Sequence, residues 1–366
     1  MHQTRLGDIA SYINGYAFKP EQRGKIGLPI IRIQDLTGNA YDLGFYDGDY
    51  QKKVEINDGD VLISWSASLG VYEWNRGKAL LNQHIFKVVF DKLAVDKKYF
   101  MYAVQYKLEE MESKTHGATM KHITKKDFDN ITIPFPSIAE QERISNRLDK
   151  LRAIIGGKKS QLEKLDNLIK ARFVEMFGNV VANDKGWPTE PISKAAPTNS
   201  PKIKNNETVW LLNLDMVESQ SGKVISKLIV SEDKINASTC TFDENNVLYS
   251  KLRPYLNKVV LPDQEGYCTT ELVPLKPGKK LTREFLATLL RSDAFVGYIN
   301  EKTAGAKMPR VSMNIFRQFE CILPPIALQQ RFSEFYSQVD KSKFAVQKSL
   351  EKTQLLFDSL MQEYFG

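Results

Sequence analysis

Apolar residues recur at alternating spacings of four and three along two long stretches of the chain, 136–178 and 324–366. Such spacing is typical of a coiled-coil seam. Each stretch therefore predicts a helix roughly 60 Å long, because an α-helix rises ~1.5 Å per residue. The predicted seam residues are Ile144, Leu148, Leu151, Ile155, Leu162, Leu165 and Ile169 in the first stretch, and Phe332, Tyr336, Val339, Val346, Leu350, Phe357 and Leu360 in the second.

The two stretches align with each other without a gap. Arg143 falls on Arg331, and the terminal Gly178 falls on Gly366. A repeat of this length indicates a tandem duplication. The matched seams favour pairing of the two helices with each other, although two long helices buried separately in a helical protein would be the simpler alternative.

A pair of glycines interrupts the first predicted helix. Gly156 and Gly157 stand where the second helix has Phe344 and Ala345. Each glycine inside a helix costs ~1 kcal/mol relative to alanine. The pair therefore predicts a kink, or a close approach of another backbone.

Short apolar runs separated by turn residues precede each long helix, as expected of strands in a twisted antiparallel or mixed sheet. In the first half these runs are 28–33, 59–64 and 84–90, followed by a helical apolar face over 97–114. The second half repeats the order with runs at 209–214, 246–250 and 271–275, then a helix from 281 to about 300.

A globular module followed by a long helix thus occurs twice, which predicts an α+β fold. We expect two pseudo-symmetric modules separated by two long antiparallel helices that form a coiled coil. Antiparallel pairing follows because each helix leaves its own module and must pass the other helix to bury both seams. The expected boundaries are 1–133 and 179–320 for the modules, with 134–178 and 321–366 for the helices.

Polar, basic and aromatic residues gather in the loops of each module, where the two halves differ most. Such side chains bind phosphates and read base edges in DNA-binding proteins. In the first module the candidates are Trp65, Ser66, Ser68, Tyr72, Asn82, Gln83, His84, Lys114, His116, Thr119, Lys121 and His122. In the second they are Lys251, Arg253, Tyr255, Asn257, Lys258, Thr269, Thr270, Glu271, Lys302, Lys307 and Arg310.

For any single one of these residues, a solvated loop side chain is the simpler interpretation. Trp65 fits packing and base contact equally well, and His84 fits a structural histidine better than a ligand. Arg253 is the strongest individual candidate, because Lys251 and Tyr255 flank it.

The charge balance is compatible with an acidic partner. Lysine and arginine total 51 against 44 acidic residues, which gives a net charge of +7. No apolar run is long enough to span a membrane, and the N-terminus lacks the apolar core of a signal peptide. We therefore expect a cytoplasmic protein without a membrane partner.

Motifs for catalysis are missing from the sequence. The segment GGKKS at 156–160 lacks the first glycine of a phosphate-binding loop, and the four histidines form no ligand pair at helical spacing. The three cysteines, Cys240, Cys268 and Cys321, are far apart. The sequence predicts no metal site, no cofactor and no catalytic activity of its own.

One block occurs in both halves and resembles a known family. T-x-G-A-x-M stands at 115–120 and 303–308, and each copy is followed by a β-branched residue and an aromatic residue. The segment IPFPSIAEQERI at 133–144 is similar to the P-P-L-x-E-Q-x-x-I motif of type I restriction-modification specificity subunits. The second copy keeps Gln329 but has Leu328 in place of the motif's glutamate.

The segment GDVLISWSASLG at 59–70 also resembles the part of that family that leads into a DNA-facing loop. The resemblance implies two target-recognition domains that each read one half of a bipartite sequence in double-stranded DNA. It also implies that the helix pair sets the spacing and docks two modification (methyltransferase) subunits. These would use S-adenosylmethionine, and restriction/translocase subunits that use ATP with Mg²⁺ would join them.

Two other hypotheses remain open on the sequence alone. The modules could bind proteins or peptides, which would make the chain an interaction scaffold spaced by a coiled coil. The chain could also be an enzyme with an unrecognised site. Neighbouring methyltransferase and translocase genes would favour the DNA-recognition hypothesis over the scaffold.

Overall fold

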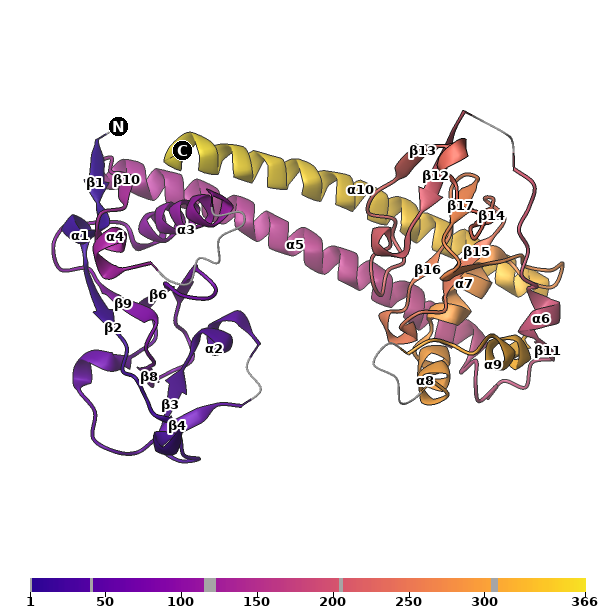
Figure 1. The fold of residues 1–366 in the computed structure, drawn as a ribbon, viewed down its shortest axis with the longest axis horizontal. Coiled ribbons are helices and arrows are strands. Elements are labelled where there is room, and N and C mark those ends of the chain that lie inside the picture. Colours follow the sequence, from indigo (N-terminus) through magenta and orange to yellow (C-terminus); the bar gives the residue numbers. More distant parts are fainter. Residues whose placement is uncertain (1, 40–41, 115–122, 204–206, 304–308) are drawn as a thin grey trace. The chain divides into compact units, whose positions relative to one another are not determined.

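The computed structural model describes residues 2–39, 42–114, 123–203, 207–303 and 309–366, apart from the side chains of 111–114. The chain divides into two compact units (Figure 1). Unit 1 comprises Met1–Lys158 with Ser349–Gly366, and unit 2 comprises Lys159–Lys348. Two helices, α5 (Ile138–Phe177) and α10 (Ile326–Phe365), each contribute one part to each unit.

Unit 1 contains two four-stranded sheets. One has the order β2-β9-β6-β7 and is antiparallel, and the other has the order β4-β3-β8-β5 with β3 and β8 parallel. The elements are β1 (Gln3–Arg5), α1 (Leu6–Ile9), β2 (Ser11–Asn14), η1 (Pro20–Gln22), β3 (Leu28–Ile31), α2 (Ile33–Thr37), β4 (Gly44–Tyr46), η2 (Lys52–Val54), β5 (Glu55–Ile56), β6 (Val61–Ser64), β7 (Gly70–Glu73), β8 (Ala79–Leu81), β9 (Ile85–Val89), α3 (Lys97–Lys114), α4 (Lys125–Asp129) and β10 (Thr132–Pro134).

Unit 2 repeats this plan in its sheets. The order β13-β12-β17-β14 contains one parallel pair, β12 with β17, and β16-β15-β18 is antiparallel. The elements are β11 (Thr189–Pro191), α6 (Ile192–Ala195), β12 (Thr208–Leu212), η3 (Leu214–Met216), β13 (Leu228–Ser231), η4 (Glu232–Lys234), β14 (Cys240–Phe242), β15 (Val247–Ser250), η5 (Pro254–Leu256), β16 (Val259–Val260), β17 (Gly266–Cys268), β18 (Leu272–Leu275), α7 (Arg283–Arg291), α8 (Asp293–Glu301), α9 (Met313–Gln318) and β19 (Glu320–Ile322).

The long helices pair antiparallel within each unit. In unit 1, Ile144 of α5 and Leu360 of α10 share a core, and Phe365 packs 5.3 Å from the Tyr99 ring of α3. In unit 2, Phe173 of α5 packs 5.4 Å from the Phe332 ring of α10. The early part of one helix therefore meets the late part of the other in both units, which confirms the predicted antiparallel arrangement.

Every predicted seam residue is buried or half-buried. The two lysines that interrupt the seams find polar partners on the opposite helix. Lys158 donates to the Ser349 hydroxyl at 2.7 Å, and Lys343 contacts the Asp166 carboxylate at 2.5 Å. Each pair gives a lysine ammonium group a hydrogen-bonding partner at a seam position that lacks an apolar side chain.

A buried glutamine braces the start of each long helix. The side-chain oxygen of Gln141 accepts a hydrogen bond from the Asp96 amide at 2.9 Å, and its nitrogen donates to the Pro136 carbonyl. Gln329 accepts from the Thr282 amide at 3.0 Å in the same way. These bonds tie α5 to the start of α3 and α10 to the start of α7, which explains the glutamine shared by the two copies of the motif.

Two sequence expectations were wrong. The helix predicted from 281 to about 300 is broken at Ser292, whose hydroxyl accepts from the Phe295 amide and so caps a second helix, α8. The close approach predicted at Gly156 and Gly157 is also wrong. A Cβ atom added at either glycine would meet nothing within 4 Å, and α5 continues through both.

Candidate nucleic-acid interface

In unit 1, loops meet at Trp65, the residue that follows β6. The Trp65 amide donates to the His84 carbonyl at 3.2 Å, and the Ile123 amide donates to the Trp65 carbonyl at 3.0 Å. The first bond joins the loop after β6 to the turn after β8. The second bond places Ile123, which stands three residues beyond the T-x-G-A-x-M segment, at the end of the same strand.

Unit 2 has the same arrangement around Lys251, the residue that follows β15. The Lys251 amide donates to the Glu271 carbonyl at 3.0 Å, and the Val311 amide donates to the Lys251 carbonyl at 2.8 Å. The duplication thus extends to individual backbone hydrogen bonds at the strand end. The sequences of the two loops differ almost completely, so the backbone hydrogen bonds are the same in both units while the side chains differ.

The loop after each of these strands contains a non-glycine residue in the left-handed region. Ala67 has φ 58° and Arg253 has φ 49°, and each lies two residues beyond the strand-end residue. His84, with φ 72°, is another such residue in unit 1, and Asn257, with φ 50°, is another in unit 2. Such conformations cost of the order of 1–3 kcal/mol and persist only where surrounding contacts impose them. Both loops are therefore held in a defined shape.

Trp65 is half-buried and both packs and remains accessible. Its ring stacks on Phe86 at 5.6 Å and meets the His84 ring edge-on at 4.9 Å. Its indole nitrogen donates to Asn14 Oδ1 at 3.3 Å. The packing interpretation of Trp65 and the contact interpretation are thus compatible, because the ring packs on its neighbours while the residue is only half-buried.

Two polar atoms in the turn 82–84 are buried without a protein partner in the described part of the chain, namely Asn82 Oδ1 and His84 Nδ1. A buried polar atom that lacks a hydrogen bond is unfavourable by about 1–3 kcal/mol. A base edge or an ordered water would satisfy them. Of the other candidates, Gln83 and Ser68 are exposed, and Ser66 and Tyr72 are half-buried.

Charged residues occupy the equivalent place in unit 2. The Glu271 carboxylate accepts from Arg310 at 2.6 Å, and the Arg253 amide donates to the Pro309 carbonyl. Among the described residues, Glu271 Oε2 and Arg253 Nε are buried without a partner. The strand end of unit 2 therefore joins Lys251, Arg253, Glu271 and Arg310.

Other candidates in unit 2 have structural partners. Asn257 is buried and donates to the Arg291 carbonyl at 3.0 Å. Lys258 donates to the Leu214 carbonyl at 2.9 Å, and burial lowers the pKa of its ammonium group. Lys302 lies at the end of α8 with its ammonium 5.0 Å from the centre of the Tyr298 ring. Tyr255 and Thr270 are exposed and Thr269 is half-buried.

Six candidates fall outside the described side chains. These are Lys114, His116, Thr119, Lys121, His122 and Lys307.

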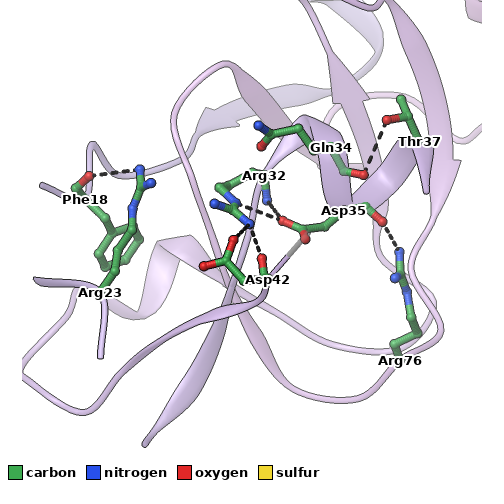
Figure 2. A network of polar contacts seen from close by, with 8 residues as sticks. All are labelled: Phe18, Arg23, Arg32, Gln34, Asp35, Thr37, Asp42 and Arg76. Atoms are coloured by element: carbon green, nitrogen blue, oxygen red, sulfur yellow. Dashed lines mark hydrogen bonds and ion pairs between the residues drawn. The ribbon is translucent and has the colours of Figure 1, made fainter. Parts of the chain in front are cut away.

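Figure 2 shows an arginine–aspartate network directly after β3 in unit 1. Asp35 accepts from the Arg32 backbone at 2.8 Å and from its side chain at 3.2 Å, and Arg76 donates to the Asp35 carbonyl at 3.0 Å. Arg32 directly follows Ile31, whose carbonyl accepts from the Asn82 amide at 3.0 Å. The network therefore fixes the strand end against which the turn 82–84 is built.

Sequence reasoning missed Asn14 and Tyr16. Asn14 binds the Trp65 indole, and the Tyr16 carbonyl accepts from the Gln83 amide at 2.9 Å. Both lie about 50 residues or more before the loops they contact, at a place without a family motif. The signal that could have found them is the run NGYAF at 14–18, in which a turn dipeptide is followed by two aromatic residues.

Within the ranges that the structure describes, no group of three or more histidine, cysteine, aspartate or glutamate side chains is placed to hold a metal ion. No helix in those ranges is long and apolar enough to cross a membrane.

A family model described as "Type I restriction modification DNA specificity domain" matches residues 1–165 and 175–355. The chain belongs to this family. Membership confirms the predicted role in DNA sequence recognition and places the chain with the non-catalytic specificity subunits. The matched backbone hydrogen bonds around Trp65 and Lys251 therefore belong to a protein of this family.

Curated relatives are specificity subunits as well. The chain is 26% identical to the type I restriction enzyme MjaVIII specificity subunit of Methanocaldococcus jannaschii, over 99% of this chain and 75% of that protein. It is 21% identical to the EcoDI specificity subunit of Escherichia coli, over 83% and 77%. The match to the EcoBI specificity subunit of the same organism is 28% identical but covers only 51% of this chain and 41% of that protein.

Solved structures share the fold. A type I restriction-modification S subunit from M. genitalium superposes with a TM-score of 0.59 at 16% identity, and covers 100% of this chain and 96% of that one. A chain from a study of complex assembly and conformational transition of the type I R-M system gives a TM-score of 0.55 at 14% identity, with 100% and 97% covered. The α+β fold with two long helices is thereby confirmed.

Proposed function

We propose that each module reads one half of a bipartite target in double-stranded DNA through the loops at its strand end. The first target-recognition domain spans 1–133 and the second spans 179–320. The observation that carries this proposal is the matched hydrogen bonding around Trp65 and Lys251. Two strand ends with the same backbone hydrogen bonds but different side chains suit the recognition of two different half-sites.

The side chains at the two strand ends suit different contacts. Arg253 and Lys251 can donate to guanine edges or phosphates, and Glu271 can accept from an amino group of cytosine. In the first module, Trp65, Asn82 and His84 offer an aromatic face and neutral polar atoms. Recognition of a half-site by residues 179–320 should therefore depend more on charged side chains than recognition of the other half-site by residues 1–133.

The helix pair, 134–178 with 321–366, sets the spacing between the half-sites and docks two methyltransferase subunits in this proposal. Its support is the duplication itself, since two equivalent surfaces suit two identical partners. Restriction subunits would join the same assembly. S-adenosylmethionine and ATP with Mg²⁺ would be used by the partners, and the cytoplasm is the compartment that we propose because the ligand is DNA.

The test is to co-express the chain with its modification subunit and sequence the host DNA for methylated adenines. The proposal predicts one bipartite motif. A stable complex that methylates only a contiguous motif would contradict the two-reader proposal. Failure to form any complex with the modification subunit would instead favour a protein-interaction scaffold.

A further inference from the structure

Unit 1 contains an aromatic cavity that none of the predicted contact residues lines. Its volume is about 700 Å³. It lies between the end of β2, the loop that follows, and the segment from β4 to η2. The lining residues are Asn14, Gly15, Tyr16, Phe18, Tyr46, Asp49, Tyr50, Gln51, Lys53 and Val54.

The aromatic walls of this cavity are fixed by packing and hydrogen bonds. Phe18 and Val54 belong to a small buried cluster against which Tyr46 and Tyr50 pack. The Tyr46 hydroxyl donates to the Asp49 carbonyl at 3.1 Å, and the Tyr50 hydroxyl donates to Glu55 at 2.8 Å. A cavity with ordered walls can receive a flat ring without first rearranging.

Tyr16 is held at the rim but is not covered. Its ring meets Phe18 edge-on at 4.9 Å, yet 48% of Tyr16 is exposed. Exposure of a tyrosine that lines a cavity leaves an aromatic face available for a ligand. Around the rim, Asn14 and Gln51 offer amides, Asp49 a carboxylate, and Lys53 an ammonium group.

The cavity is continuous with the strand-end loops of the same module. Asn14 lines the cavity and also accepts from the Trp65 indole, and Tyr16 accepts from the Gln83 amide. Between them, a Cβ atom on Gly15 would lie only 2.0 Å from the Asn82 carbonyl oxygen, so the two backbones touch there. A nucleotide held against Trp65 or Gln83 would therefore have the cavity beside it.

We propose that this cavity accepts one unpaired base, extruded from the duplex at the half-site read by the first module. Aromatic side chains stack on any base, and the amides and the carboxylate suit the hydrogen-bonding edge that extrusion exposes. Lys53 suits the adjoining phosphate. In the second module, α6 corresponds to α1 at a shift of 186 residues, so the equivalent stretch is SPKIK at 200–204, which has no aromatic residue. The extruded base therefore belongs to one half-site only.

This inference rests on the proposed reading of one half-site by each module, and the test separates the two. The purified complex with the modification subunit is titrated with its bipartite target carrying a mismatch at each position in turn. A mismatch lowers the energy needed to unpair a base, so it tightens binding only where a base is extruded. The same series is measured for Tyr16→Ala, Tyr16→Phe and Ile26→Ala, the last being a matched control because Ile26 is 69% exposed outside the cavity.

We expect one position in the first module's half-site at which a mismatch tightens binding about 10-fold or more. Tyr16→Ala should abolish that gain, as should an abasic nucleotide at the same position, whereas Tyr16→Phe and Ile26→Ala should retain it. A gain at the methylated adenine that persists in Tyr16→Ala belongs to the modification subunit. Specific binding with no Tyr16-dependent gain would overturn the base pocket alone. Loss of half-site specificity in the wild-type complex would overturn the proposed function, and the pocket with it.

Discussion

The two modules share a backbone arrangement but differ in the chemistry they place on it. In unit 1 the strand-end residue is Trp65, which contacts His84, and in unit 2 it is Lys251, which lies beside Glu271. The equivalent loop residues Ala67 and Arg253 both adopt left-handed backbone. The difference shows that the duplicated chain kept the backbone arrangement that positions the loops, while the side chains in those loops diverged.

The largest effect should follow from Gly15→Ala. The new Cβ atom would lie 2.0 Å from a backbone oxygen of Asn82, which a side-chain rotation cannot relieve. Overpacking of this kind costs about 1–3 kcal/mol. Urea unfolding should show this loss, and methylome sequencing should show relaxed recognition of one half-site only.

Gly24→Ala is the control for that variant, because the nearest atom to its added Cβ is at 3.7 Å, an ordinary contact distance. Equal destabilisation by both substitutions would show that the close approach at Gly15 does not matter. Loss of both half-sites would show that the modules are not independent.

Arg253→Ala should affect the other module. If Arg253 reads a base edge with two hydrogen bonds, its loss should weaken binding to the specific site by about 1–3 kcal/mol and relax one position of that half-site. Affinity for specific and random DNA, measured at one salt concentration, checks this. Arg317→Ala, an exposed arginine on α9, serves as the control. An equal loss on random DNA would reduce Arg253 to a phosphate contact.

The two long helices differ at Gly156 and Gly157, where the second helix has Phe344 and Ala345, and alanine at both positions should remove the cost of the two glycines. Open space surrounds both glycines, so the substitutions should stabilise α5 by ~1 kcal/mol each without a clash. Thermal unfolding measures the gain. A decrease in stability would show that these glycines have a role that their open surroundings do not reveal.

All three cysteines lie in unit 2, so their reactivity reports on the folding of that unit alone. This measurement needs no substitution in unit 2. Burial raises the pKa of the Cys268 and Cys321 thiols to about 12, so little reactive thiolate forms near neutral pH. Half-buried Cys240 should therefore react with a thiol reagent well before the other two. Gly15 lies in unit 1, so the Gly15→Ala variant should keep this order of reactivity. Rapid reaction of Cys268 or Cys321 in that variant would contradict independent folding of the modules.

Local pattern was enough to predict much of the fold. The apolar face over 97–114 coincides with α3, and the runs at 59–64 and 246–250 contain β6 and β15. Ser292 escaped prediction because the apolar pattern continues across it, and only the cap bond to Phe295 ends one helix and starts the next. Periodicity alone does not reveal such a break.

The candidate site was predictable only in part. Trp65, His84, Lys251 and Glu271 were found because they lie in loops that follow recognisable strands. Their convergence depends on hydrogen bonds between residues far apart in the chain, which no local pattern encodes. Asn14 and Tyr16 were missed for the same reason, since their link to Trp65 and Gln83 exists only through sheet pairing.

The central claim is that each module reads its own half-site, and exchange of one module tests it most directly. Residues 1–133 would be replaced by the same segment of another family member, the chimaera co-expressed with the modification subunit, and methylated adenines mapped. The account predicts a motif in which one half-site changes while the other half-site and the spacing stay the same. A change in both half-sites, with the complex still assembled and active, would contradict it.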